Sequence, residues 1–230
     1  MATEKALIVG AGSGLSASLA RLFHSEGMAT ALAARDAEKL AALSKEAGAA
    51  TYACDAAKRS DVEALFAALD EEGAADLVVY NPSFRIKGPI AELDPEGVEK
   101  SLMVSAYGGF LVAQQAARRM LEMGHGTILF TGASASVKGY AGSAPFAMGK
   151  FALRGLAQSM ARELQPRNIH VGHVVIDGGI GNPGDPRAGS RGEDGMLDPD
   201  AIAQNYLQLH RQHRSAWTWE IELRPWLETF

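Results

Sequence analysis

The chain has 230 residues, 47% of them hydrophobic, which suffices for one large core in a protein of this length. Its formal net charge of −5 gives no reason to expect nucleic acid or an anionic membrane as a partner. The single cysteine, Cys54, excludes an intrachain disulfide, and there is neither a secretion signal at the start nor an apolar run of membrane-spanning length. We therefore expect a soluble cytoplasmic protein.

Short apolar runs alternate with longer amphipathic segments along most of the chain. The first run, residues 6–9, is apolar at every position, as expected of a strand that is buried on both faces. Similar runs predict further strands at 29–34, 50–53, 77–80, 127–131, 169–176 and, as a last candidate, 217–223. Apolar stripes between these runs predict helices, of which the longer ones cover 15–27, 95–123 and 146–164.

Two of the predicted helices begin with capping signals. Ser60 and Glu63 form the pattern of a capping box, which predicts a helix that covers 62–69. Asp94 followed by Pro95 places an N-cap residue directly before a proline at the first helical position.

This alternation of strands and helices indicates the fold class. Short connections between successive strands require a parallel sheet with right-handed crossovers and helices on both faces. We predict a Rossmann-like, doubly wound α/β fold of about seven strands, with residues 1–230 forming a single domain. One segment, 178–195, is rich in Gly, Pro, Asp and Arg and reads as a mobile loop after a strand. This loop either covers a binding site as a lid or is a disordered segment without function.

A glycine-rich turn directly follows the first predicted strand. Gly10, Gly12 and Gly14, with Ser13 between them, lie where this strand gives way to a helix. Glycine there lets the backbone turn sharply and approach a pyrophosphate, whose charge the helix N-terminus favours. Many tight turns need glycine, but the position after a first strand favours a nucleotide site.

The end of the second predicted strand bears on the choice of nucleotide. A carboxylate there would hold the ribose 2′-hydroxyl of NAD and repel a 2′-phosphate. This chain has Arg35 instead, and a guanidinium suits a phosphate. Arg35 could also be a solvated cation near a helix start. We favour NADP(H) over NAD(H).

The chain resembles the short-chain dehydrogenase/reductase family over about residues 5–223. The resemblance is carried by the glycine-rich turn, by Asn81 at the end of the fourth strand and by Lys150, at the position of the lysine in the family motif Tyr-x-x-x-Lys. It implies that Lys150 holds the ribose next to the nicotinamide and that Asp55 borders the adenine, although Asp55 could equally be a turn residue. The cofactor contacts it implies are Gly10, Gly12, Ser13, Gly14, Leu15, Arg35, Asp55, Asn81, Lys150 and Ile180.

The chain departs from the family at three catalytic positions. Phe146 replaces the tyrosine that exchanges the proton, Ala133 replaces the serine thirteen residues earlier, and Ser105 replaces a helical asparagine. Phenylalanine and alanine carry no exchangeable side-chain proton. Candidate replacement donors are Ser134 and Tyr140, so our candidate catalytic residues are Lys150, Ser134 and Tyr140.

Three functional hypotheses follow. The first is an NADP(H)-dependent oxidoreductase with a non-standard proton donor, which transfers hydride to a small carbonyl, enone, imine or quinone substrate. The second is a catalytically silent NADP(H)-binding sensor or partner subunit. The third is a fold kept for interaction alone. The histidines lack metal-ligand spacing, so we expect no metal site.

The resemblance also implies a homodimer or homotetramer that pairs through the helices predicted at 95–123 and 146–164. The small residues Ala147, Gly149, Ala152 and Gly155 on the second of these helices would permit close contact between subunits. We expect a small-molecule substrate, and neither nucleic acid nor a membrane as a partner.

Overall fold

The computed structural model describes residues 3–182 and 185–229. Within these ranges, one parallel sheet contains seven strands in the order β3-β2-β1-β4-β5-β6-β7. The strands are β1 (Lys5–Val9), β2 (Ala29–Ala34), β3 (Ala50–Ala53), β4 (Leu77–Tyr80), β5 (Gly126–Thr131), β6 (Ile169–Ile176) and β7 (Glu220–Leu223). The predicted fold class is confirmed. The chain order reverses beside β1, which pairs with both β2 and β4, and such a switch point is where open α/β sheets bind ligands.

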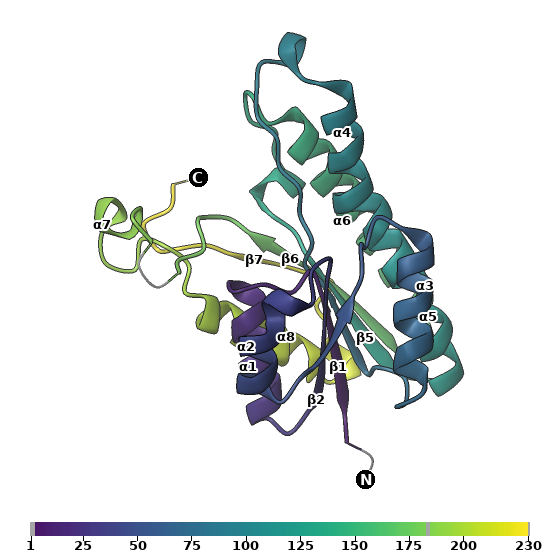
Figure 1. Ribbon diagram of the computed structural model, residues 1–230. Coiled ribbons are helices and arrows are strands. Elements are labelled where there is room, and N and C mark those ends of the chain that lie inside the picture. The colour runs from purple at the N-terminus through teal and green to yellow at the C-terminus, as the bar shows by residue number, and fades with distance from the viewer. Residues whose placement is uncertain (1–2, 183–184, 230) are drawn as a thin grey trace.

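Helices cover both faces of the sheet (Figure 1). Apolar residues of α1 (Leu15–Ser25), α2 (Ala41–Ala47) and α8 (Pro199–His210) pack on one face, together with Ala6 and Ile8 of β1. The other face carries α3 (Arg59–Asp70), α5 (Gly108–Met123) and α6 (Ala144–Leu164), together with Leu7 and Val9. Since successive residues of β1 enter opposite cores, the strand has to be apolar throughout.

Two predicted element starts are wrong. The helix α3 begins at Arg59 after Lys58, which makes no side-chain cap, and Ser60 Oγ contacts Asp61 instead of capping a backbone amide. The strand β7 begins at Glu220 and not at 217, because Trp217 stacks on His170 with ring centroids 4.8 Å apart. The second difference arises from a contact between distant segments, which a local pattern does not contain.

The capping signal at Asp94 is confirmed. Its carboxylate accepts hydrogen bonds from the amides of Glu96 and Gly97, and Pro95 opens α4 (Pro95–Leu102). The predicted long helix then continues as α5, after one π-helical turn at Met103–Tyr107.

The π-helical turn has a visible cause. The Tyr80 hydroxyl donates a hydrogen bond to the backbone carbonyl of Val104, which is thereby satisfied outside the helix. Gly108 passes so close to Tyr80 of β4 and to the segment after β3 that a Cβ there would lie 2.5 Å from the Tyr80 hydroxyl oxygen and 2.6 Å from the Ala56 carbonyl oxygen. The turn leaves Ser105 fully buried, beside the start of α6. Single π-helical turns of this kind occur frequently at functional sites.

The loop 178–195 has contacts with the rest of the chain where the structure describes it. Ile180 pairs with Leu197, and the loop includes α7 (Ala188–Arg191). The C-terminal segment runs beside α7 (Figure 1), where Arg191 forms an ion pair with Glu228 at 3.3 Å. Residues 183–184 lie outside the described ranges, and the lid function stays a prediction. Among the described helices, none combines the length and apolarity that a membrane span requires.

Candidate active site

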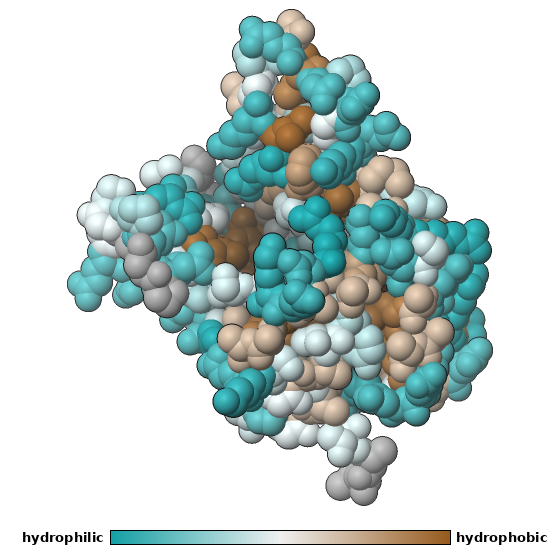
Figure 2. Space-filling view, in the orientation of Figure 1, coloured by the Kyte–Doolittle hydropathy of each residue, from teal (hydrophilic) through white to brown (hydrophobic). Residues whose placement is uncertain are grey.

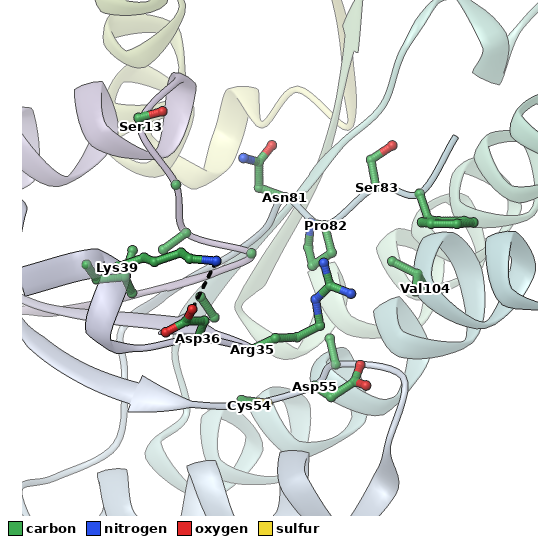
Figure 3. Close-up of a pocket in the computed structure, with 17 residues that line it drawn as sticks. Ser13, Arg35, Asp36, Lys39, Cys54, Asp55, Asn81, Pro82, Ser83 and Val104 are labelled. Atoms are coloured by element: carbon green, nitrogen blue, oxygen red, sulfur yellow. Dashed lines mark ion pairs between the residues drawn. The ribbon is translucent and has the colours of Figure 1, made fainter. Parts of the chain in front are cut away.

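A cavity of about 790 Å³ lies at the carboxyl ends of β1, β2 and β4, at the switch point of the sheet (Figure 3). Its volume falls within the range of about 300–1,000 Å³ that is usual for small-molecule sites. On the face drawn in Figure 2, the molecule is hollowed between the part that carries α4 and α6 and the part that carries α1 and α2. The lining residues are Gly10, Ala11, Gly12, Ser13, Ala34, Arg35, Asp36, Lys39, Leu40, Cys54, Asp55, Ala56, Asn81, Pro82, Ser83, Phe84 and Val104.

The glycine-rich turn forms one wall of the cavity. Gly10 has φ +82°, and a Cβ there would lie 2.6 Å from the backbone nitrogen of Pro82, so both the conformation and the packing require glycine. Gly12 differs, because a Cβ there would meet no heavy atom of the described residues within 4 Å. No packing contact therefore explains Gly12, whereas a ligand that approaches the backbone closely would explain it.

Ser16 and Asn81 tie this turn to the end of β4. The Asn81 side-chain amide donates to Ser16 Oγ at 2.8 Å, and Ser16 Oγ donates to the Gly10 carbonyl oxygen at 3.2 Å. The Asn81 backbone amide also donates to Val9 at 2.9 Å. Asn81 therefore stabilises the position of the glycine-rich turn and also lines the cavity. The sequence did not indicate the part of Ser16, which depends on a contact between distant segments.

Two cationic side chains line the cavity at the end of β2. Arg35 extends across the cavity toward Pro82, and no ion pair joins it to any described carboxylate (Figure 3). Lys39 lies beside it and pairs with Asp36, with 3.0 Å between Lys39 Nζ and Asp36 Oδ2. The hydrogen bond from Lys39 lowers the pKa of Asp36, so this carboxylate stays ionised and offsets the charge of Lys39. Sequence reasoning missed Lys39, although its spacing of three residues from Asp36 was a usable signal.

Asp55 and Cys54 lie at the end of β3. Asp55 Oδ1 accepts a hydrogen bond from the Ala57 amide at 3.1 Å, so Asp55 is a turn residue and also lines the cavity. The turn function of Asp55 is thus confirmed, and its contact with the adenine stays a prediction. Burial raises the pKa of the Cys54 thiol to about 12, which keeps the thiol protonated and unreactive at neutral pH.

The structure brings the three family catalytic positions close to the start of α6, as an apolar and buried group. Phe146 and Ala133 pack in one cluster with Ala135, and Phe146 is only 5% exposed. Ser105 lies against Gly149, where a Cβ would be 2.7 Å from the Ser105 Cβ, and its hydroxyl has no partner among the described residues. The expectation that Gly149 contacts another subunit is therefore wrong, since Gly149 is buried within its own chain.

Lys150 is fully buried behind this cluster. Its Nζ donates to the Thr131 carbonyl oxygen at 2.7 Å. Burial, together with the nearby charge of Arg85, lowers the pKa of Lys150 to about 8. Lys150 does not line the cavity in this structure.

Arg85 is a residue that sequence reasoning missed. Its guanidinium carbon lies 3.9 Å from the centroid of the Phe146 ring, and it therefore covers the residue that replaces the family tyrosine. A lone arginine in a loop carries no local sequence signal. Its position becomes visible only where the segment after β4 meets the start of α6.

The remaining predicted residues lie in several places. Ser134 is half-buried beside Ala133, whereas Tyr140 is 46% exposed, with its ring 5.8 Å from Lys138 Nζ. Leu15 packs in the core, and Ile180 pairs with Leu197. The cavity lining thus includes Gly10, Gly12, Ser13, Arg35, Asp55 and Asn81 but omits Gly14, Leu15, Ser134, Tyr140, Lys150 and Ile180. No cluster of three potential metal ligands occurs in the described part of the chain.

The lowered pKa of Lys150 predicts a pH-dependent stability. Unfolded lysine titrates near 10.5 and folded Lys150 near 8, so the unfolded chain binds more protons between these values. The contribution of Lys150 is therefore fully present above pH 10.5 and is lost as the pH falls through 8. Wild type should gain on the order of 3 kcal/mol relative to Lys150→Met between pH 7 and pH 10.5, measured by urea unfolding. Lys87→Met, at an exposed site, serves as the control, and a flat difference for Lys150→Met would contradict the assignment.

A doubly wound parallel sheet with a glycine-rich turn and a cavity at its switch point is the architecture of nucleotide-binding α/β proteins. Residues 4–181 match the family model described as short chain dehydrogenase. The chain belongs to the short-chain dehydrogenase/reductase family.

Individual relatives agree with this assignment. The chain is similar to the cyclic-di-GMP-binding biofilm dispersal mediator protein of Escherichia coli (strain K12), with 32% identity over 80% of this chain and 76% of the relative. It is also similar to carbonyl reductase [NADPH] 2 of Sus scrofa, with 32% identity over 74% and 69%. A crystal structure of a short-chain dehydrogenase from Rhodopseudomonas palustris matches with 36% identity and a TM-score of 0.84, over 98% of this chain and 100% of that one.

Proposed function

We propose that the protein is an NADP(H)-dependent oxidoreductase that transfers hydride to a small carbonyl, enone, imine or quinone substrate. The observation that carries the proposal is the cavity, which has unfilled space at Gly12 and two cations, Arg35 and Lys39, at the end of β2. Two solved relatives support it, since a metagenomic short-chain oxidoreductase (27% identical) is in complex with NADP and an actinorhodin polyketide ketoreductase (25% identical) is with NADPH.

The chain offers a place for each part of this cofactor. The amides of the turn around Gly12 and the N-terminus of α1 suit a pyrophosphate. Arg35 and Lys39 suit a 2′-phosphate. Lys150 would hold the ribose beside the nicotinamide only after its Nζ leaves the Thr131 carbonyl oxygen, because it is buried outside the cavity lining in this structure. When bound, NADPH would supply the hydride.

The apolar cluster around Phe146 limits the kinds of substrate that could accept a hydride at an appreciable rate. General acid–base help is worth about 10²–10⁴ in rate. Loss of an oxyanion donor costs roughly another 10²–10³. Phe146 and Ala133 provide neither group, so an ordinary ketone would react slowly. An activated alkene, an iminium or a quinone needs less help from a proton donor, and we favour these substrates.

A second candidate function is a catalytically silent NADP(H)-binding sensor or partner subunit. It is favoured by the buried apolar cluster of Phe146, Ala133 and Ala135. The name of the Escherichia coli relative, a cyclic-di-GMP-binding mediator, is compatible with a regulatory function for a protein of this fold. A steady-state screen of carbonyls, enones, imines and quinones with NADPH separates the two, because the silent protein would consume none.

Gly12→Val tests the cofactor site. A Cβ at position 12 meets no heavy atom of the described residues within 4 Å, and the valine methyl groups would extend into the space that we assign to the pyrophosphate, so we expect a melting temperature within a few degrees of wild type. NADPH affinity, measured by nucleotide fluorescence, should fall by about tenfold or more, with a smaller loss for Gly12→Ala. Wild type that binds neither NADPH nor NADH would contradict both candidate functions and leave the interaction hypothesis.

We also propose that the chain forms a homodimer or homotetramer. Four large apolar side chains are exposed on or beside the long helices, namely Tyr107, Phe110, Met148 and Phe151. Clusters of this kind commonly mark subunit contacts. A monomer at micromolar concentration in sedimentation equilibrium would contradict this.

A further inference from the structure

Arg85 and Lys150 place two positive charges around one aromatic ring. The guanidinium carbon of Arg85 lies 3.9 Å from the Phe146 ring centroid, and Lys150 Nζ lies 5.9 Å from the same point. The wall beside them is apolar and consists of Ala133 and Ala135.

Neither cation pairs with a carboxylate among residues 3–182 and 185–229. Within these ranges Lys150 hydrogen bonds only to the Thr131 carbonyl oxygen, and the one attractive interaction of Arg85 is its contact with the Phe146 ring. Some arginines elsewhere pair with carboxylates, as in Arg154 with Glu220 and Arg187 with Asp185, whereas others, such as Arg35 in the cavity, have no ion pair with a described residue. Two like charges at a partly desolvated site destabilise one another, and a bound anion would offset that cost. Arg85 is an exposed residue, so solvent screens part of this repulsion, but one side of its guanidinium is covered by the Phe146 ring, and this partial desolvation lowers the pKa of Arg85.

The fold fixes Arg85 in this position. Ser101 is fully buried on α4, and its hydroxyl donates to the Phe84 carbonyl oxygen at 2.9 Å. Ser101 Oγ also lies 3.4 Å from the Pro145 carbonyl oxygen. Phe84 and Pro145 directly precede Arg85 and Phe146 in the chain. One buried side chain therefore sets the two backbones beside each other, so the contact between the guanidinium and the ring is built into the site.

The location favours a substrate group over a cofactor group. Ser83 and Phe84 line the nucleotide cavity, and Arg85 follows them at its edge, on the side of Phe146 and Lys150. The cations assigned to the 2′-phosphate, Arg35 and Lys39, lie at the end of β2. With its guanidinium carbon over the ring and no hydrogen bond to a described residue, Arg85 has N–H donors available for the two oxygens of a carboxylate.

We propose that Arg85 binds a carboxylate of the substrate and that the substrate is a small carboxylic acid whose hydride-accepting double bond lies against the wall of Ala133 and Phe146. This inference rests on the proposed function, because it places the carboxylate next to bound NADP(H).

The test measures binding of matched acids and amides to the full-length protein saturated with NADP⁺. The probe pairs are acetate with acetamide, benzoate with benzamide, and cinnamate with cinnamamide, titrated by calorimetry against wild type, Arg85→Gln, Arg85→Lys and the control Lys87→Gln. At least one acid should bind about tenfold or more tightly than its amide, as expected for a charge-assisted hydrogen bond. That preference should vanish in Arg85→Gln, fall in Arg85→Lys, which keeps the charge but loses the planar fork, and persist in Lys87→Gln.

The outcomes separate this inference from the proposed function. If every variant binds NADP⁺ as wild type does, but no acid is preferred over its amide, the carboxylate site is refuted and the cofactor assignment stands. An acid preference that survives in Arg85→Gln also refutes it, since another group then holds the anion. Failure of wild type to bind NADP⁺ or NADPH would refute the proposed function itself, and with it this inference.

Discussion

Replacement of Arg35 by glutamate is expected to weaken NADPH binding about 100-fold while NADH binding changes little. A hydrogen bond to a charged group is worth about 1.5–3 kcal/mol, or roughly 10- to 150-fold in affinity. The reversed charge adds repulsion of the 2′-phosphate. Arg35 extends into the cavity without a described carboxylate partner, so its loss leaves no partner unpaired (Figure 3). NADH has no 2′-phosphate and should bind Arg35→Glu within about threefold of wild type.

The control for this experiment is Lys45→Glu. Lys45 is an exposed cation on α2 outside the cavity, and its reversal changes the net charge by the same amount. Lys39→Gln should cause a smaller loss than Arg35→Glu, because Asp36 already offsets the charge of Lys39 at 3.0 Å. Equal losses for NADPH and NADH in Arg35→Glu would mean that Arg35 supports the cavity and does not select the nucleotide.

The strands could be predicted because their burial is local information. A strand such as Leu77–Tyr80, buried at every position, has to be hydrophobic along its whole length, and the sequence shows this directly. The cavity wall was predicted in two ways. Gly10 and Arg35 follow predicted strands, whose carboxyl ends meet at one edge of a parallel sheet, whereas the family resemblance indicated Asp55 and Asn81. All four residues line the cavity.

Two of the failures share one physical cause, which is contact between segments distant in sequence. Trp217 was included in a strand because nothing nearby reveals its stacking on His170. The failure at Ser60 is local instead, since α3 starts three residues before the predicted position 62 and Ser60 Oγ bonds to its neighbour Asp61. The position of Arg85 depends on a loop that Ser101 aligns with the start of α6. A single sequence does not encode such pairings in any local pattern.

The double variant Phe146→Tyr with Ala133→Ser is expected to raise kcat/KM for simple ketones about 10²–10⁴-fold over wild type. The two positions pack in one buried cluster, so the new hydroxyls would lie in the same small space. Lys150 is one helical turn after Phe146, with its Nζ 5.9 Å from the ring centroid, and a cation at this range favours ionisation of a phenol. Arg85, stacked on the same ring, acts in the same direction. The measurement is steady-state oxidation of NADPH.

Phe146→Tyr alone should give less than about tenfold, because Ala133 still lacks the hydroxyl that would hold the developing oxyanion. Phe151→Tyr is the matched control, since it adds a phenol to the exposed face of the same helix and should change nothing. If the double variant binds NADPH but remains inactive, the missing hydroxyls do not explain the low ketone activity. The buried Ser105, whose hydroxyl has no partner in the described chain, would then be the next position to change, as it replaces the family asparagine behind Lys150. Inactivity of that triple variant would favour the silent binding protein over the enzyme, because the site would hold every side chain of the family pattern without turnover.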